Sequence, residues 1–369
     1  MGNNQITILL LVLTCCVYSC SFKSNCLNEK HEIITIDLSS RENSLSLSPF
    51  ISEMSTIKLE LPSPYFWGVV TDVLFTDSTL FVVDKKGGNV FHFRKDGVFL
   101  NKIGNRGEAP GEFLHLHSSF INEDHIFICD IKLRKIHCYT HSGKYIKTIS
   151  SPMNLVYDDI FVLPNGKFLC HDIQGCKGES KIWLMNGNGE KEKTLLFHEN
   201  NFPYSYSDWN TINSFSDKEI NILDPITGIV YLYDVNEDEL FKVFQLLSDR
   251  KNFSSFSGTS ELASIKEQYA FSPFIINAMK YVYSIWSTSD EIVLFSLYEK
   301  DKDKIHAFKT PCLDTLGYSM WPLPVSTNLP NAMVTVITDE CPLEYYPECY
   351  KENVSEQIML VNIMKFKHE

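Results

Sequence analysis

Four aspartates recur at one position of a repeated sequence pattern, and they are the first candidates for chemistry. Asp84, Asp130, Asp172 and Asp224 each follow a short apolar run. A ring of carboxylates of this kind could bind a cation. An aspartate that follows a strand can also cap the next turn by accepting hydrogen bonds from nearby backbone N–H groups. Because four copies carry it, the repetition favours the structural role.

A glycine-rich loop, Gly104–Phe113, carries the charged side chains of Arg106, Glu108 and Glu112. Loops on a rigid scaffold often carry function. We therefore predict Arg106 and Glu108 as ligand-binding residues. The glycine spacing is not that of a phosphate-binding P-loop. The alternative is that this loop only connects two structural repeats.

His115 and His117 are two positions apart and would share one face of a strand, where a pair of imidazoles can ligate a metal. No third ligand with suitable spacing accompanies them. No cysteine pair has the CxxC spacing of a zinc site either. The sequence therefore predicts no metal site and no cofactor.

Residues 250–281 interrupt the repeated pattern and include a helix-like stretch, Glu261–Tyr269. Insertions in repeat folds often lie on the binding face. We therefore predict that Phe271, Phe274 and the nearby Trp286 line a ligand site. The alternative is that these aromatic side chains are part of the core.

The elements that must position these residues come from an internal repeat. Leu80–Asp84 and Val90–Phe93 return 46 residues later as Ile126–Asp130 and Ile136–Tyr139. Looser copies begin near Phe168, Ile220, Ile292 and Met333. A period of about 40–50 residues with about four short strands is typical of a propeller blade. The sequence therefore predicts an all-β, six-bladed β-propeller of four-stranded antiparallel blades.

The composition agrees with this fold class and excludes some partners. Of the 369 residues, 44% are hydrophobic and 13% are aromatic, which favours strands and supplies a core. The formal net charge is −13, so the phosphates of a nucleic acid would repel the chain. We therefore predict no nucleic-acid partner.

The N-terminus has the pattern of an export signal. The apolar run Ile6–Tyr18 is too short to span a bilayer. The sequence Val17-Tyr18-Ser19-Cys20 resembles a bacterial lipobox, which implies cleavage before Cys20 and acylation of Cys20. The predicted organisation is a signal peptide (1–19), a lipidated linker (20–50) and a propeller (51–369). The alternatives are a plain secretory signal or a buried N-terminal strand.

Eight of the 11 cysteines follow Cys20. An exported chain with an even number of cysteines is compatible with disulfides. Cys129 and Cys138 lie on either side of an expected hairpin, and Cys341 and Cys349 could close a short loop. The alternative is that the strand cysteines are small buried apolar residues.

Two segments resemble known propeller families. Gly104–Phe113 is similar to the connector between NHL-type repeats. Ile36–Leu38 with Ile57–Leu61, and the closing stretch Ile358–Leu360, resemble a family of bacterial six-bladed β-propeller lipoproteins. The resemblance implies a ring of the NHL or TolB-like type. It also implies that the strand near Ile57–Leu61 completes the last blade, so that the N- and C-terminal strands pair.

The predicted function follows from this fold and from the motifs that are missing. The sequence has no G-x-S-x-G elbow and no H-E-x-x-H motif. We predict a lipid-anchored protein of the bacterial cell envelope that binds a protein, peptide or glycan, and the missing motifs favour binding over catalysis. The alternative is a hydrolase or lyase with carboxylates, with or without calcium, at the mouth of the propeller channel.

Overall fold

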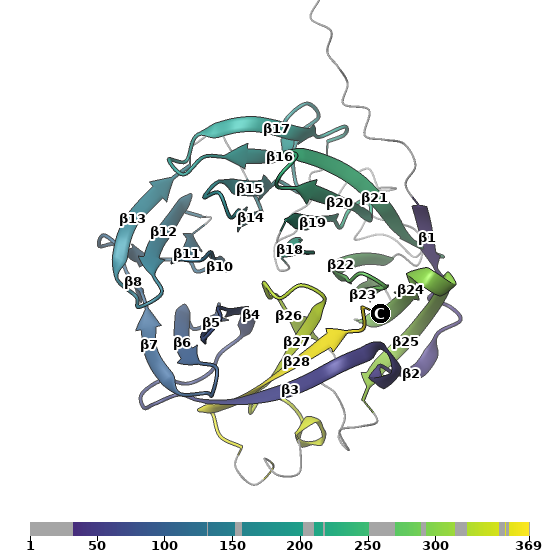
Figure 1. The fold of residues 1–369 in the computed structure, drawn as a ribbon, viewed down its shortest axis with the longest axis horizontal. Helices are drawn as coiled ribbons and strands as arrows, with labels where there is room; N and C mark the ends of the chain where they lie inside the picture. Colours follow the sequence, from purple (N-terminus) through teal and green to yellow (C-terminus); the bar gives the residue numbers. More distant parts are fainter. Residues whose placement is uncertain are drawn as a thin grey trace, which may run out of the picture.

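Six β-sheets stand radially around one axis and form a six-bladed propeller (Figure 1). The computed structural model describes residues 32–130, 132–151, 157–201, 210–216, 218–250, 270–288, 293–313, 323–346, 351 and 354–368. The predicted all-β, six-bladed architecture is confirmed. The predicted signal peptide, Cys20, Cys349 and the helix-like stretch Glu261–Tyr269 lie outside the described residues.

The first three blades each contain four consecutive antiparallel strands. Blade 1 consists of β4 (Val70–Phe75), β5 (Thr79–Asp84), β6 (Asn89–Arg94) and β7 (Phe99–Ile103). Blade 2 consists of β10 (Ser118–Ile121), β11 (His125–Asp130), β12 (Lys135–Thr140) and β13 (Tyr145–Ser150). Blade 3 consists of β14 (Asp159–Val162), β15 (Phe168–His171), β16 (Ser180–Met185) and β17 (Lys191–Phe197). A small parallel pair, β8 (Asn105–Arg106) and β9 (Glu112–Phe113), lies between blades 1 and 2.

The other three blades recruit strands from the N-terminal segment. Blade 4 consists of β18 (Ile212–Ser214), β19 (Glu219–Asp224), β20 (Ile229–Asp234), β21 (Glu239–Ser248) and β1 (Glu32–Ile36). Blade 5 consists of β22 (Ala270–Asn277), β23 (Tyr281–Thr288), β24 (Leu294–Glu299), β25 (Lys304–Cys312) and β2 (Glu42–Ser46). Blade 6 consists of β26 (Pro324–Val325), β27 (Ala332–Ile337), β28 (Ile358–Phe366) and β3 (Ile51–Glu60). Short 3-10 turns occur at Ser48–Phe50, Lys300–Lys302 and Leu343–Tyr345.

The ring closes by pairing the two ends of the chain. β3 is the outermost strand of blade 6 and runs antiparallel to β28, with Ile57 opposite Val361 (Figure 1). This closure was predicted, and the structure confirms it. Since the last blade borrows its fourth strand from the start of the propeller, it cannot separate from the ring without breaking this ladder.

The segment before β3 is more than a connector. β1 adds to blade 4 in parallel with β21, and β2 adds to blade 5 in parallel with β25. In β1, Ile34 and Ile36 are buried whereas Ile33 is exposed, which is the alternation of a half-buried strand. The part of the predicted linker that the structure describes therefore belongs to the folded ring.

Each junction between neighbouring blades has its own apolar core. Six clusters of buried side chains occupy the six junctions, and each draws residues from the two blades that meet there. A single blade has two apolar faces and cannot bury both, whereas every blade in a closed ring is covered on both sides. The repeat therefore becomes stable only when the ring is complete.

The described cysteines do not pair. Cys129 and Cys138 are buried free thiols, and Cys341 is also free. Cys129 lies opposite Ile136 and Cys138 lies opposite Phe127, so the two cysteines are offset diagonally across the β11–β12 ladder. They pack in the core between blades 2 and 3 as small apolar residues instead of forming the predicted disulfide. In the described part of the chain, no helix has the length and apolar character that crossing a membrane requires.

Candidate functional site

One face of the ring collects the irregular segments of the fold, and we call it the loop face. It consists of the turns between the second and third strands of each blade and the segments that lead into each innermost strand. In blade 1, for example, the last residue of β5, Asp84, pairs with the first residue of β4, Val70. The turn after Asp84 and the segment before Val70 therefore lie at the same end of the sheet. Function in a propeller is expected at such loops.

The recurring aspartates hold the loop face together. Asp84 accepts a hydrogen bond from Gly87 N at 2.9 Å, in the turn that follows it. Asp130 accepts hydrogen bonds from Leu133 N, in its own turn, and from Leu114 N and His115 N, in the incoming loop. These contacts show the structural role that the repetition favoured, in which the aspartate carboxylates cap turns. Asp130 in particular fixes the backbone that carries His115.

The glycine-rich loop is a rigid connector between blades 1 and 2. Gly104 and Gly111 have φ angles of 63° and 80°, in the left-handed region that favours glycine. Glu112 accepts a hydrogen bond from Ala109 N at 3.0 Å and thereby closes the turn between them. Tyr139 donates its hydroxyl proton to the Gly111 carbonyl oxygen. The loop thus presents Arg106 on a fixed backbone.

Arg106 lies in a hollow with a strong positive charge, which we call the cationic hollow. Its cavity volume is about 390 Å³. Its ionisable lining comes from the turn after Asp84, from the glycine-rich loop, from the segment before β10, from the turn after Asp130 and from the start of blade 3. These residues are Lys85, Lys86, Arg106, His115, His117, Lys132 and Asp158. Blades 1 and 2 thus bring together four cations that are far apart in the sequence.

Asp158 is the one carboxylate among the described residues that line the cationic hollow. It accepts hydrogen bonds from Ile173 N at 2.7 Å and from Gln174 Nε2 at 3.0 Å, so its oxygens are already engaged. Burial, aided by the nearby charge of Asp172, raises the pKa of Asp158 to about 6. Among the described residues, Lys85, Lys86, Arg106 and Lys132 form no ion pair. The hollow therefore keeps a net positive charge at neutral pH.

The structure separates the predicted ligand residues. Arg106 lines the cationic hollow, whereas Glu108 is exposed and is not among the described residues that line it. Trp286 is only 1% exposed and belongs to the core between blades 4 and 5, so it offers no surface to a ligand. Phe274 packs in the core between blades 5 and 6, and one edge reaches a hollow at the propeller axis. Phe271 lies in β22, and its side chain is outside the described part.

Sequence reasoning missed the three lysines of the cationic hollow. They had a visible signal, because Lys85, Lys86 and Lys132 stand one or two positions after the recurring aspartates Asp84 and Asp130. A residue that follows such an aspartate lies in a turn of the loop face. The histidine pair was considered only as a metal ligand, and the structure places it beside four cations instead. No group of three or more described His, Cys, Asp or Glu side chains could hold a metal ion.

Two buried carboxyl groups lie near the propeller axis. Asp72 accepts hydrogen bonds from Asn210 Nδ2 at 2.5 Å and Thr71 Oγ1 at 2.6 Å. Asp159 accepts from the backbone N–H groups of Thr211 and Ile212 at 2.6 and 2.9 Å. Burial raises the pKa of Asp72 to about 6 and that of Asp159 to about 7.

These carboxyl groups tie blades 1 and 3 to blade 4 and do not face an open site. Each is 1% exposed. The neighbouring hollow at the axis has a volume of about 330 Å³, and its described lining contains Thr71 and Asn210 but no carboxylate. The contacts of Asp72 and Asp159 are those of structural ties between innermost strands. They supply no pair of accessible carboxylates for hydrolysis.

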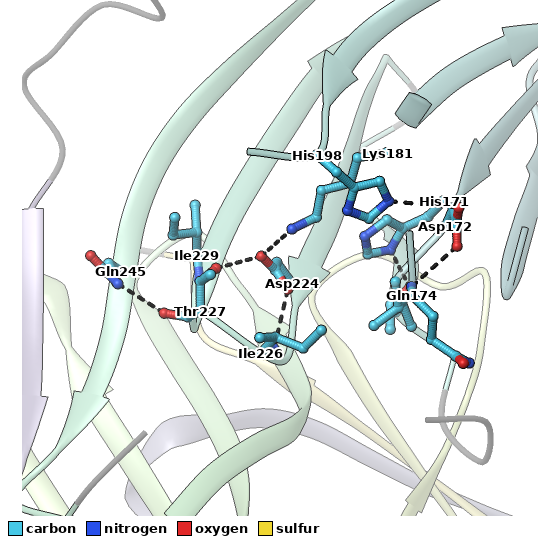
Figure 2. A network of polar contacts seen from close by, with 12 residues as sticks. His171, Asp172, Gln174, Lys181, His198, Asp224, Ile226, Thr227, Ile229 and Gln245 are labelled. Atoms are coloured by element: carbon cyan, nitrogen blue, oxygen red, sulfur yellow. Dashed lines mark hydrogen bonds and ion pairs between the residues drawn. The ribbon is translucent and has the colours of Figure 1, made fainter. Parts of the chain in front are cut away.

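A third hollow lies at the junction of blades 3 and 4, and we call it the mixed hollow. Its volume is about 310 Å³. Figure 2 shows the polar network beneath it, in which Lys181 reaches Asp224 with Nζ 2.5 Å from the carboxylate. Thr227 donates its hydroxyl proton to the same carboxylate and accepts a hydrogen bond at its carbonyl oxygen from Gln245 Nε2 at 2.8 Å. Burial would raise the pKa of Asp224, but Lys181 and Thr227 hold it below its ordinary value.

A chain of polar contacts connects the mixed hollow with the cationic hollow. His198 Nε2 lies 3.6 Å from Asp172 Oδ2 (Figure 2). Asp172 accepts a hydrogen bond from Gln174 N, and the Gln174 side chain donates to Asp158. His198 lines the mixed hollow and Asp158 lines the cationic hollow. A chain of polar contacts within blade 3 therefore links the two hollows.

The fold is that of a six-bladed β-propeller with hollows at its loop face. Residues 32–363 match the family described as a domain of unknown function, DUF4934. The chain belongs to this family. The NHL resemblance of the connector, and the assignment of the ring to the NHL or TolB-like type, stay predictions.

Two solved structures share the architecture. One comes from Bacteroides fragilis and is assigned as an exported protein. It is 15% identical, covers 91% of this chain and 100% of its own length, and has a TM-score of 0.72. The other is a member of the DUF4221 family from Bacteroides vulgatus, which is 8% identical and covers 87% of this chain and 98% of its own, with a TM-score of 0.51. At these identities the likeness concerns the fold alone. No protein of curated function matches the sequence.

Proposed function

We propose that this protein is a ligand-binding module of the bacterial cell envelope that takes an anionic ligand in the cationic hollow. The observation that carries the proposal is the convergence of Lys85, Lys86, Arg106 and Lys132 on one hollow of about 390 Å³. The whole chain has a net charge of −13, so this concentration of unpaired cations is contrary to its overall charge. Like charges held together cost free energy unless an anion offsets them.

The chemistry of the lining indicates an oxyanion group. The Arg106 guanidinium presents a planar fork of donors that matches carboxylate, sulfate or phosphate, and the lysines add point charges. The fixed backbone of the glycine-rich loop reduces the ordering that binding would require. Leu114 and Leu116 line the same hollow and offer apolar contact to the rest of the ligand.

Binding of anionic sugars tests the proposal. Glucose 6-phosphate, glucose 6-sulfate and glucuronate are titrated calorimetrically, with glucose as the uncharged analogue. We expect at least one anion to bind more tightly than glucose and more weakly as salt rises. The double variant Arg106→Glu/Lys132→Glu should lose about tenfold or more in affinity, because two attractive contacts become repulsive.

A matched control separates this site from general charge. Lys304→Glu reverses an exposed lysine at the start of β25, away from the cationic hollow, and should leave the affinity unchanged. The proposal fails if all three anions bind no better than glucose. It also fails if the Lys304→Glu variant loses as much affinity as the double variant.

The proposed location rests on the N-terminal sequence. The apolar run and Val17-Tyr18-Ser19-Cys20 favour export and acylation of Cys20. The fold shared with a protein assigned as exported supports export only in a general way. Mass spectrometry of the mature protein should find a chain that begins at Cys20 with a mass increment from acyl chains. An N-terminus at Met1, or an unmodified Cys20, would exclude the lipid anchor.

A further inference from the structure

The mixed hollow has a chemistry of its own, distinct from the cationic hollow. It is lined by residues of blades 3 and 4: Ile173, Lys181, Leu196, Phe197, His198, Glu199, Asn200, Asn201, Asp224, Ile226, Thr227, Ile229, Tyr231 and Lys242. We propose that the mixed hollow binds one neutral sugar unit of a glycan. This second site goes beyond the proposed anion binding and does not depend on it.

The charges of the mixed hollow balance one another. Lys181 and Asp224 form a direct ion pair with side chains only 11% and 0% exposed. Glu199 and Lys242 lie on the rim with opposite charges. Among the described lining residues, two carboxylates therefore oppose two ammonium groups. A hollow without net charge has no electrostatic preference for a free anion or a free cation, so its occupant is neutral.

One wall of the mixed hollow offers an aromatic surface that the fold leaves open. Phe197, at the end of β17, is 52% exposed although most large apolar side chains of the ring are buried. Leu196 and Ile229 lie beside it in the lining. The ring C–H groups of a hexopyranose form an apolar face, and this face gains free energy when it covers an aromatic side chain. An ion or a fully polar ligand would leave the Phe197 surface in water.

The rim of the mixed hollow supplies polar groups that are not used within the fold. Among the described residues, the side chains of Glu199, Asn200 and Lys242 make no hydrogen bond or ion pair. Asn201 accepts a hydrogen bond from Lys177 N at 3.0 Å, which leaves its NH₂ group to donate. A sugar hydroxyl both donates and accepts, so a rim with acceptors and donors side by side suits it. An apolar ligand would leave these groups unpaired.

The walls of the mixed hollow are fixed before any ligand binds. Asp224 accepts from Ile226 N, Thr227 Oγ1 and Lys181 Nζ, and Gln245 holds the Thr227 carbonyl oxygen (Figure 2). Such a network leaves few rotamers to order on binding. A volume of about 310 Å³ is at the small end of the range for ligand sites, as one sugar unit requires.

Saturation-transfer NMR with four neutral methyl glycosides tests the inference. The probes are the methyl glycosides of glucose, galactose, mannose and N-acetylglucosamine. We expect saturable binding of at least one probe by the full mature chain. Phe197→Ala and Asn200→Ala should each weaken that binding by about fivefold, the effect of losing one stacking or hydrogen-bonding contact.

Two controls make the outcome specific. Phe241→Ala removes a comparable exposed ring, 37% exposed on β21, that does not line the hollow, and it should leave the affinity unchanged. The Arg106→Glu/Lys132→Glu variant should also keep its sugar affinity, so failure of the anion proposal would not be confused with failure of this one. The inference is overturned if no probe gives saturable binding at about 10 mM. It is equally overturned if Phe197→Ala binds as well as Phe241→Ala.

Discussion

Replacing Lys181 with alanine should destabilise the protein by about 3–5 kcal/mol. Asp224 is fully buried, and the Lys181 ammonium is its only cationic partner in the described structure. Removing the lysine leaves a buried carboxylate that only hydroxyl and backbone donors compensate. Urea unfolding at pH 7 gives the change in the free energy of unfolding.

The pH dependence of the Lys181→Ala effect identifies its cause. In the native wild type the pKa of Asp224 lies below its ordinary value, so the stabilisation by the pair is present at neutral pH. It is lost as pH falls through that lowered pKa. In the Lys181→Ala variant, burial without the lysine would raise the pKa of Asp224 above its ordinary value. The charged carboxylate would then destabilise the fold at neutral pH, and protonation of Asp224 at lower pH would remove this destabilisation. The two proteins should therefore converge in stability at low pH.

A second ion pair provides the control for Lys181→Ala. Lys193 contacts Asp238 at 3.0 Å, but the two side chains are 43% and 48% exposed. Because water screens this pair, Lys193→Ala should cost about 1 kcal/mol or less. If Lys181→Ala and Lys193→Ala lower the free energy of unfolding equally, burial does not set the energetic contribution of the Lys181–Asp224 pair. The predicted cost of Lys181→Ala would then be wrong.

Replacing Trp286 with alanine should also cost about 3–5 kcal/mol. Its indole packs in the core between blades 4 and 5, together with Ile36 of β1. Its Nε1–H donates to Ser284 Oγ at 2.9 Å and Ser296 Oγ at 3.0 Å. The variant therefore creates a cavity and leaves two buried hydroxyls with fewer partners. Chemical denaturation measures the loss.

The contrast with an exposed ring decides between the core and ligand roles of Trp286. Phe66 is 51% exposed, so Phe66→Ala should change the stability by no more than about 0.5 kcal/mol. A Trp286→Ala variant that keeps wild-type stability but loses affinity for a ligand would restore the ligand-binding hypothesis for Trp286 and contradict the core assignment.

The aromatic residues of the interrupted segment show why composition and position alone misassign a side chain. Phe271, Phe274 and Trp286 stand next to a break in the repeat, which is a reasonable place for a site. Yet β23 is buried on both faces: Trp286 packs in the core between blades 4 and 5, whereas Tyr283 and Ile285 pack in the core between blades 5 and 6. Phe197, in contrast, is exposed at the end of a regular strand, where no sequence motif distinguishes it.

The cationic hollow was partly visible in the sequence. Arg106 could be predicted because a cluster of glycines between two repeats is recognisable in the sequence as a loop. The recurring aspartates are followed by Lys85, Lys86 and Lys132. Their positions in turns could therefore be predicted from the sequence, but their proximity to one another could not. The same limit applies to Lys181 and Asp224, which are 43 positions apart and belong to different blades.

The repeat and the aspartate-capped turns were set by local sequence, whereas the closure of the ring was expected from a family resemblance and joins β3 to β28, at opposite ends of the propeller. Strand periodicity and turn residues act over a few positions, and a blade that cannot bury its faces alone requires neighbours. The tertiary structure alone decided which charges meet at each junction, which carboxyl groups become ties near the axis, and that β1 and β2 extend blades 4 and 5. These depend on how neighbouring blades pack. Nothing in a linear sequence records which turn of one blade lies against which loop of the next.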